Sequence, residues 1–131
     1  MRASLRRTIG WTALLLLPVA YLVGSEAYYA RSISPHGISS VRDFFDRFGE
    51  PRHVRMVQRD GQSYYEFTGR LPSRFVLATP SAPPAYVFDQ QGHFTAWCSD
   101  PGDIPSYRET WPLQSTNELE IGLVREKFGL R

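Results

Sequence analysis

The side chains best suited to covalent chemistry in this chain are one cysteine, Cys98, and three histidines. A cysteine nucleophile needs a histidine base within hydrogen-bond reach. His93 is the nearest in sequence, but it lies five positions before Cys98 in a segment with the pattern of one strand. Side chains at an odd separation point to opposite faces of a strand, so we do not expect a Cys–His pair there. His36 and His53 would reach Cys98 only through the fold.

Three aspartates, Asp89, Asp100 and Asp103, suggest a calcium loop. Calcium takes about six to eight oxygen ligands, usually from acids at alternating positions. Pro101 and Gly102 separate Asp100 from Asp103, and no third acid follows in register. Asp, Pro and Gly are also the residues of ordinary turns. The sequence therefore predicts a turn here and no metal site. For the chain as a whole we expect no cofactor and no catalytic residues.

An aromatic group is the strongest candidate for a binding surface, and aromatic side chains are enriched at protein contacts. One interpretation places these rings in the core of the domain. The other places them on the rim of a groove, beside the acidic turn, that receives a side chain of a partner protein. Both interpretations stay open, and the candidate interaction surface consists of Trp97, Trp111, Tyr86, Tyr107, Asp100 and Asp103.

A small α+β domain is expected to position these residues. Ser40 and Asp43 have the spacing of a capping box, which predicts a helix that ends at Gly49 before Pro51. Its apolar stripe consists of Val41, Phe44, Phe45 and Phe48. Alternating segments then predict strands at 52–59, 62–68, 74–79, 85–89 and 93–99, and Asp60-Gly61 predicts a hairpin turn.

The last part of the chain is predicted to be helical. A helical turn is expected at 105–111, and a C-terminal helix is expected to begin at Ser115 with Glu118 completing a capping box. Leu119, Leu123 and Phe128 would form its buried face. The expected architecture is a short helix packed on a three- to five-stranded antiparallel sheet, followed by a C-terminal helix.

The N-terminal segment has the pattern of a signal or a membrane anchor. Arg2, Arg6 and Arg7 precede an uncharged run at 8–25, whose apolar positions include Ile9, Leu14, Leu17 and Val23. As a helix it would span about 27 Å, close to the thickness of about 30 Å of a bilayer core. We predict an anchor at 1–27, a connector at 28–39 and the domain at 40–131. The alternative is a secreted domain released by cleavage near Ala27.

The charge distribution bears on both topology and partners. The leader, with three arginines and Glu26, carries the whole net charge of +2, so residues 28–131 are neutral. A neutral domain argues against a nucleic-acid partner. The positive-inside rule places the N-terminus in the cytoplasm and the domain outside it, as a single-pass protein of the inner membrane. The local cluster Arg52, His53, Arg55 and Arg59 is interpreted as the solvated face of a strand, and Cys98 is expected to be buried.

Several short motifs are similar to those of the SmpA/OmlA-type envelope module. They are Gly37-Ile38-Ser39, Phe48-Gly49-Glu50-Pro51, Tyr65-Glu66-Phe67 and Tyr86-Val87-Phe88-Asp89-Gln90-Gln91-Gly92. The resemblance covers about Gly37 to Trp97, and this chain has no lipid-attachment cysteine after the leader. It implies a small α+β envelope scaffold that binds other proteins and has no active site.

The sequence thus leaves two hypotheses about function. The first is a membrane-anchored, non-enzymatic envelope protein that acts as a protein-interaction module for an unidentified partner. The alternative is a small secreted ligand-binding or hydrolytic domain with an acidic and aromatic pocket formed by Asp100, Asp103 and Trp97.

Overall fold

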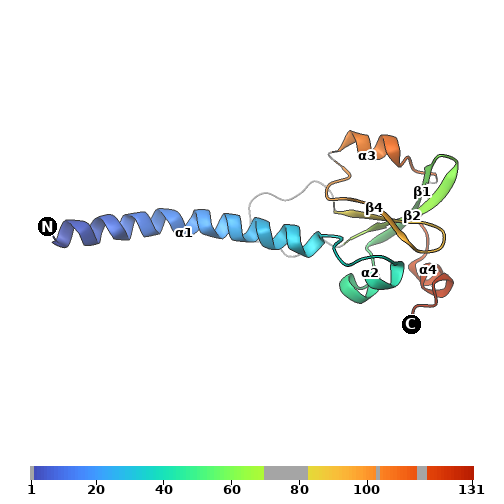
Figure 1. Cartoon of the computed structure of the whole chain (residues 1–131), viewed down its shortest axis with the longest axis horizontal. Coiled ribbons are helices and arrows are strands. Elements are labelled where there is room, and N and C mark those ends of the chain that lie inside the picture. Colours follow the sequence, from blue (N-terminus) through green and yellow to red (C-terminus); the bar gives the residue numbers. More distant parts are fainter. Residues whose placement is uncertain (1, 70–82, 103, 115–117) are drawn as a thin grey trace. The chain divides into compact units, whose positions relative to one another are not determined.

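The computed structural model describes residues 2–69, 83–102, 104–114 and 118–131. They belong to two compact units, of which the first contains the N-terminal helix up to Ser32 and the second begins at Ile33. The elements are α1 (Arg2–Ile33), α2 (Val41–Phe48), β1 (His53–Arg59), β2 (Gln62–Thr68), β3 (Ala85–Phe88), β4 (Phe94–Cys98), α3 (Pro105–Thr110) and α4 (Ile121–Lys127). The predicted α+β class is confirmed (Figure 1). The strand predicted at 74–79 lies outside the described residues.

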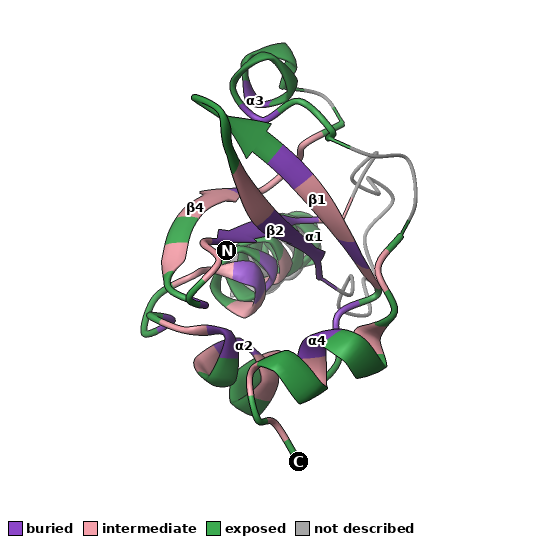
Figure 2. Ribbon diagram, turned by 90° about the vertical axis from the view of Figure 1, so that its right-hand side faces the viewer, coloured by how far each residue is buried: buried purple, intermediate pink, exposed green. Residues whose placement is uncertain are grey.

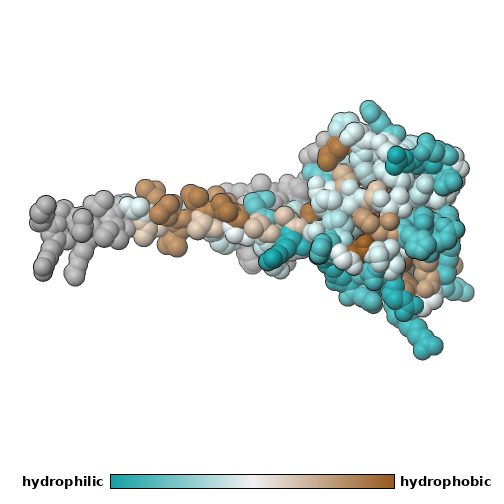
Figure 3. Space-filling view, in the orientation of Figure 1, coloured by the Kyte–Doolittle hydropathy of each residue, from teal (hydrophilic) through white to brown (hydrophobic). Residues whose placement is uncertain are grey.

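Helix α1 presents apolar side chains on every side. Four consecutive residues, Leu14 to Leu17, are each 59% to 70% exposed, and four successive positions point to all sides of a helix. Val23 is exposed as well, while Ile9 lies on the same helix. The segment from Thr12 to Ile33 is long and apolar enough to cross a membrane, and Figure 3 shows its apolar surface in brown. The helix also continues through residues 28–33, where we had placed the start of the connector.

The four strands form one antiparallel sheet in the order β1-β2-β3-β4. The predicted hairpin between β1 and β2 is present. Asp60 and Gly61 both have positive φ angles, 51° and 75°, which a two-residue turn of the primed type requires. The register that follows pairs Arg59 with Gln62 and Arg55 with Glu66.

Residues 112–114 and Leu119 lie along the free edge of β1. The N–H of Gln58 donates to the carbonyl of Pro112 at 2.9 Å, and the N–H of Leu119 donates to the carbonyl of Val54 at 2.8 Å. The predicted first residue of the C-terminal helix, Ser115, lies outside the described residues, but residues 118–120 are not helical and α4 begins only at Ile121, which corrects our prediction. Glu118 lies before the helix, and its carboxylate is 2.9 Å from Nδ1 of His53.

The two faces of the sheet are covered by different helices (Figures 1 and 2). On one face, α2 and α4 cover a core of aromatic rings, with Phe44 fully buried against Phe67, Tyr86 and Phe88. The predicted capping box of α2 is confirmed, since Ser40 accepts from the N–H of Asp43. The buried face of α4 is shifted from our prediction. Leu119 and Phe128 pack against the core as predicted, but Leu123 is exposed and Val124 is buried in its place.

On the opposite face, α3 covers a smaller cluster. Its buried apolar members are Val57, Ala85, Val87, Cys98, Tyr107 and Trp111. The same face carries two buried polar residues of β2, Glu66 and Thr68. The chain thus buries polar groups of its sheet mainly under α3, which is where we look for a site.

Candidate functional site

The structure separates the residues of the predicted interaction surface. Tyr86 is 1% exposed and lies in the aromatic core, where its hydroxyl donates to the carbonyl of Ile33 at 2.5 Å. Tyr107 and Trp111 are buried on the other face, under α3. Trp97 and Asp100 are partly exposed, and Asp103 lies outside the described residues. Tyr107 and Trp111 therefore come together under α3, whereas Trp97 lies directly opposite Tyr86 on β3 and packs against the aromatic core.

Trp97, Tyr107 and Trp111 all contribute to the lining of a groove beside the edge strand β4. The groove has a volume of about 360 Å³, and its lining consists of Trp97, Cys98, Ser99, Ile104, Ser106, Tyr107, Thr110 and Trp111. We call it the β4 groove. The indole N–H of Trp97 is buried and has no hydrogen-bond partner in the described part of the chain. On the side of α3, the lining of the groove contains two buried aromatic residues, Tyr107 and Trp111, and one exposed aliphatic side chain, Ile104.

Cys98 is buried, as we predicted, and it is one of the residues that line the β4 groove. Burial raises the pKa of its thiol, and the nearby negative charges of Asp100 and Glu66 act in the same direction. The thiol therefore stays protonated at neutral pH, which makes it a poor nucleophile. His93 lies in the turn before β4, where its Nδ1 is 3.3 Å from a carboxylate oxygen of Asp89.

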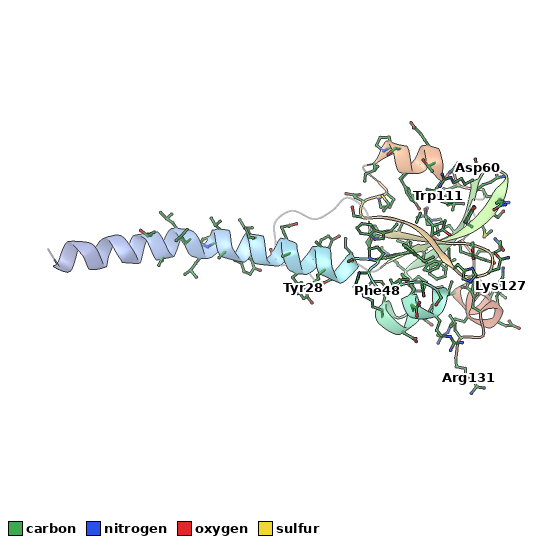
Figure 4. All side chains as sticks on the ribbon, in the orientation of Figure 1. Tyr28, Phe48, Asp60, Trp111, Lys127 and Arg131 are labelled. Atoms are coloured by element: carbon green, nitrogen blue, oxygen red, sulfur yellow. The ribbon has the colours of Figure 1, made fainter. Side chains whose placement is uncertain are left out.

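A second cavity, which we call the α3 pocket, lies on the other side of Tyr107 and Trp111. Its volume is about 350 Å³. Its polar lining comes from Arg55, Glu66, Thr68, Tyr107 and Arg108, and its other lining residues are Pro83, Pro101, Gly102, Trp111, Pro112 and Leu113. In Figure 4 the labelled Trp111 lies between α3 and the sheet. The pocket therefore has an apolar wall and a polar floor.

The floor of the α3 pocket is a buried polar cluster. Glu66 is 7% exposed, and one of its carboxylate oxygens accepts a hydrogen bond of 2.7 Å from the hydroxyl of Tyr107. Its other oxygen is 3.6 Å from Nε of Arg55, too far for a hydrogen bond. The Nε–H of Arg55 is buried and has no hydrogen-bond partner among the described residues. The hydroxyl of Tyr107 thus has a hydrogen-bond partner in this cluster, whereas the Nε–H of Arg55 has none among the described residues.

The electrostatics of this cluster hold Tyr107 in its neutral form. Burial raises the pKa of the Tyr107 hydroxyl far above its ordinary value, and the negative charge of Glu66 and the hydrogen bond to it raise it further. The phenol therefore acts as a hydrogen-bond donor over the physiological pH range. Trp111 is fixed beside it by an edge-on contact with Tyr64 and by the guanidinium of Arg59, 5.0 Å from its ring centroid.

Our interpretation of the sequence missed Arg55 and Glu66. We had assigned Arg55 to a solvated strand face, and Glu66 was only part of a motif. A usable signal was present, because a two-residue hairpin at Asp60-Gly61 places residue 55 opposite residue 66. An arginine and a glutamate directly opposite each other form a cross-strand pair.

Comparison of the chain with family models, curated proteins and solved structures finds no match. The resemblance to the SmpA/OmlA-type module therefore stays a prediction. Among the described residues, no group of three His, Cys, Asp or Glu side chains gathers as a metal site. What the arrangement offers chemically is a neutral phenol, a buried carboxylate and a guanidinium with unused donors, set against an apolar wall.

Proposed function

We propose that this chain is a membrane-anchored, non-enzymatic binding protein of the cell envelope. In this proposal α1 stays attached and crosses the inner membrane once, with the N-terminus in the cytoplasm. The domain then presents the surface around α3 to a partner protein outside the cytoplasm. The observation that carries the proposal is the exposure of Leu14 to Leu17 on all sides of α1. Water disfavours such a surface, whereas the hydrocarbon core of a membrane accommodates it.

The proposed binding surface is supported by the position of exposed aliphatic side chains. Within the described part of the domain, the large apolar side chains that are most exposed are Ile104, Leu113 and Leu123. Ile104 lines the β4 groove and Leu113 lines the α3 pocket, so two of the three flank α3. Apolar side chains around a concave site are typical of contact surfaces.

A non-enzymatic role is supported by the chemistry of the buried groups. The pKa of the Cys98 thiol and that of the Tyr107 hydroxyl are both raised, so neither supplies an anionic nucleophile at neutral pH. In the α3 pocket the described residues supply one carboxylate, Glu66, whereas glycoside hydrolysis uses a pair. The ligand-binding alternative keeps support from the α3 pocket, whose volume falls within the range of small-molecule sites.

The anchor is tested by the mass of the membrane-extracted protein. An intact chain of 15.0 kDa supports the proposal. Loss of about 3 kDa, from cleavage near Ala27, would show a signal peptide instead. Protease added to sealed, right-side-out vesicles should digest the domain, and protection of the domain would contradict the proposed orientation.

The surface is tested by site-specific photo-crosslinking in intact membranes. A crosslinking residue at Ser106, an exposed position in the β4 groove, should give a discrete product with one protein. The substitutions Ile104→Ser and Leu113→Ser should weaken this product. Leu123→Ser is the matched control, because it removes an exposed leucine from α4 on the opposite face. Equal crosslinking in all three variants would contradict the proposed surface.

A further inference from the structure

We infer that the α3 pocket binds a ligand through a carboxylate group, which Arg55 and Arg108 receive. This inference rests on the proposed function, since it names the chemistry that the same binding site recognises. The site is assembled from β1, β2 and α3, and every group used below belongs to the second unit.

The first support is the unused hydrogen-bonding capacity of Arg55. A guanidinium has five N–H donors in a planar fork that matches the two oxygens of a carboxylate. In the described part of the chain, the charge partner of Arg55 is Glu66, 3.6 Å from its Nε, and the buried Nε–H has no hydrogen-bond partner. A buried donor without a partner costs free energy, so a ligand that accepts from it recovers that cost on binding.

The second support is the charge balance of the pocket. Among the described residues that line it, there are two guanidinium groups, those of Arg55 and Arg108, and one carboxylate, that of Glu66. The Nε of Arg108 donates to the carbonyl of Pro101, another lining residue, at 3.3 Å, and this bond does not use the terminal nitrogens of the guanidinium. The described part of the lining therefore has an excess positive charge, which attracts an anionic group and disfavours a cationic one.

Glu66 acts as a positioning residue in this arrangement. It accepts from Tyr107 on one oxygen, and its other oxygen attracts Arg55 from the directly opposite position on β1. Arg55 is thereby held toward the pocket, although about a third of its side chain is exposed. One oxygen of Glu66 already accepts a hydrogen bond from Tyr107. The N–H donors of Arg55 are therefore the main groups of the pocket floor that can still form hydrogen bonds with a ligand.

The rest of the ligand is expected to be apolar. Trp111, Leu113 and three prolines form the wall, and the volume of about 350 Å³ suits a compact body rather than an acetate ion alone. Two sources carry such chemistry: a free organic acid with an aromatic or aliphatic body, and the C-terminal carboxylate of a peptide chain that ends in an apolar residue.

The binding experiment uses the full-length chain in detergent micelles, labelled with ¹⁵N, and follows the Nε–H resonance of Arg55. The free-acid probe is N-acetylphenylalanine, and its amide is the neutral control. The peptide probe is Gly-Ser-Gly-Phe with a free C-terminus, compared with the C-terminally amidated form. We expect the carboxylates to shift the Arg55 resonance saturably and the amides to bind at least about tenfold more weakly. The tighter of the two carboxylate probes identifies the source.

Variants separate a direct contact from a general effect. Arg55→Gln should weaken binding of the carboxylate probes by about 10-fold to 100-fold, read for this variant from the fluorescence of the tryptophans. Arg55→Lys keeps the charge but loses the fork, and should recover only part of the affinity. Arg108→Gln should cost about twofold to fivefold, because that side chain is exposed. Arg42→Gln, an exposed arginine on α2, is the matched control and should bind as the wild type. Circular dichroism verifies that each variant is folded.

Three results would overturn the inference while leaving the proposed function standing. The first is equal binding of acid and amide, which would make the pocket an apolar site. The second is binding of phenethylammonium that Glu66→Gln abolishes, which would make Glu66 the ligand contact. The third is the absence of any shift of Arg55 with all probes at millimolar concentration. The crosslinking at Ser106 is independent of these probes, so its failure would identify an error in the proposed function instead.

Discussion

The two faces of the sheet bury different kinds of side chain. The face covered by α2 and α4 buries phenylalanine and tyrosine rings that contact one another. The face covered by α3 buries Glu66 together with Tyr107, Cys98 and small aliphatic side chains. Phe44 has four aromatic neighbours on the first face besides the adjacent Phe45: Phe48, Phe67, Tyr86 and Phe88. No comparable ring cluster is described on the second, where Trp111 contacts Tyr64.

The difference indicates that the two faces contribute differently to stability and to binding. Burial of apolar rings is the main favourable term in folding, and each ring removes a large area from water. Burial of a carboxylate costs free energy unless partners compensate it, and here Arg55 compensates without a hydrogen bond. The face under α2 and α4 therefore supplies most of the stability, and the face under α3 keeps polar groups that packing alone does not require.

The largest expected effect tests the stabilising face. Phe44→Ala should lower the free energy of unfolding by about 3–5 kcal/mol, because it removes a fully buried ring from the centre of the cluster. Urea denaturation followed by circular dichroism measures the loss. Leu123→Ala, on the exposed side of α4, should change stability by less than about 0.5 kcal/mol. A similar loss in both variants would contradict the division between the faces.

A double-mutant cycle tests the polar face. Tyr107→Phe and Glu66→Leu should each cost about 1–3 kcal/mol, since each leaves a buried group without its partner. The double variant should cost less than the two together by about 1–2 kcal/mol, because neither group is then orphaned. Tyr64→Phe is the matched control, since the hydroxyl of Tyr64 bonds to Gln62 at the surface. Strict additivity would show that the hydrogen bond between Tyr107 and Glu66 contributes nothing.

The stabilising face could be predicted from the sequence because its signals are local. Ser40 and Asp43 mark the start of α2, and the spacing of Val41 and Phe44 identifies the side that packs on the sheet. The strands follow from alternation, and their first turn follows from Asp60-Gly61. Our prediction for the start of α4 was wrong because a tertiary contact competes with helix formation there. Leu119 bonds to Val54 on β1, and residues 118–120 are not helical.

The polar face was harder to predict because it depends on the path of the chain after β4. Hairpin register is enough to place Arg55 opposite Glu66. Nothing in the residues around Pro105 shows that α3 returns over the sheet and brings Tyr107 to Glu66, 41 positions away in sequence. Tyr86 illustrates the same limit. Its position on β3 allows either face, and only the packing against α2 decides that its ring is buried.

Alkaline titration gives a smaller effect that is confined to the polar face. The pKa of Tyr107 is raised in the folded protein above its ordinary value of 10.0, mainly by burial and then by Glu66. A group of this kind contributes stability that is fully present below pH 10 and is lost progressively as the pH rises above it. The urea midpoint should therefore fall above about pH 10. The fall should be shallower in Tyr107→Phe. Equal slopes in the two proteins would exclude Tyr107 as a cause of alkaline unfolding.

Acid titration should give the smallest effect, and it belongs to the other face. The pKa of Asp43 is lowered from 3.8 to about 2, chiefly by hydrogen bonds from the hydroxyl and N–H of Ser39 and then from Ser40. A lowered pKa gives stability that is present above pH 3.8 and is lost as the pH falls through about 2. Asp43→Asn should flatten the dependence of the urea midpoint on pH in that window. Asp46→Asn removes a charge from the same helix without these capping bonds, so it should keep the wild-type slope. An unchanged slope in Asp43→Asn would show that the cap of α2 does not contribute to acid unfolding, and the pH response of the aromatic face would then have to come from another carboxylate.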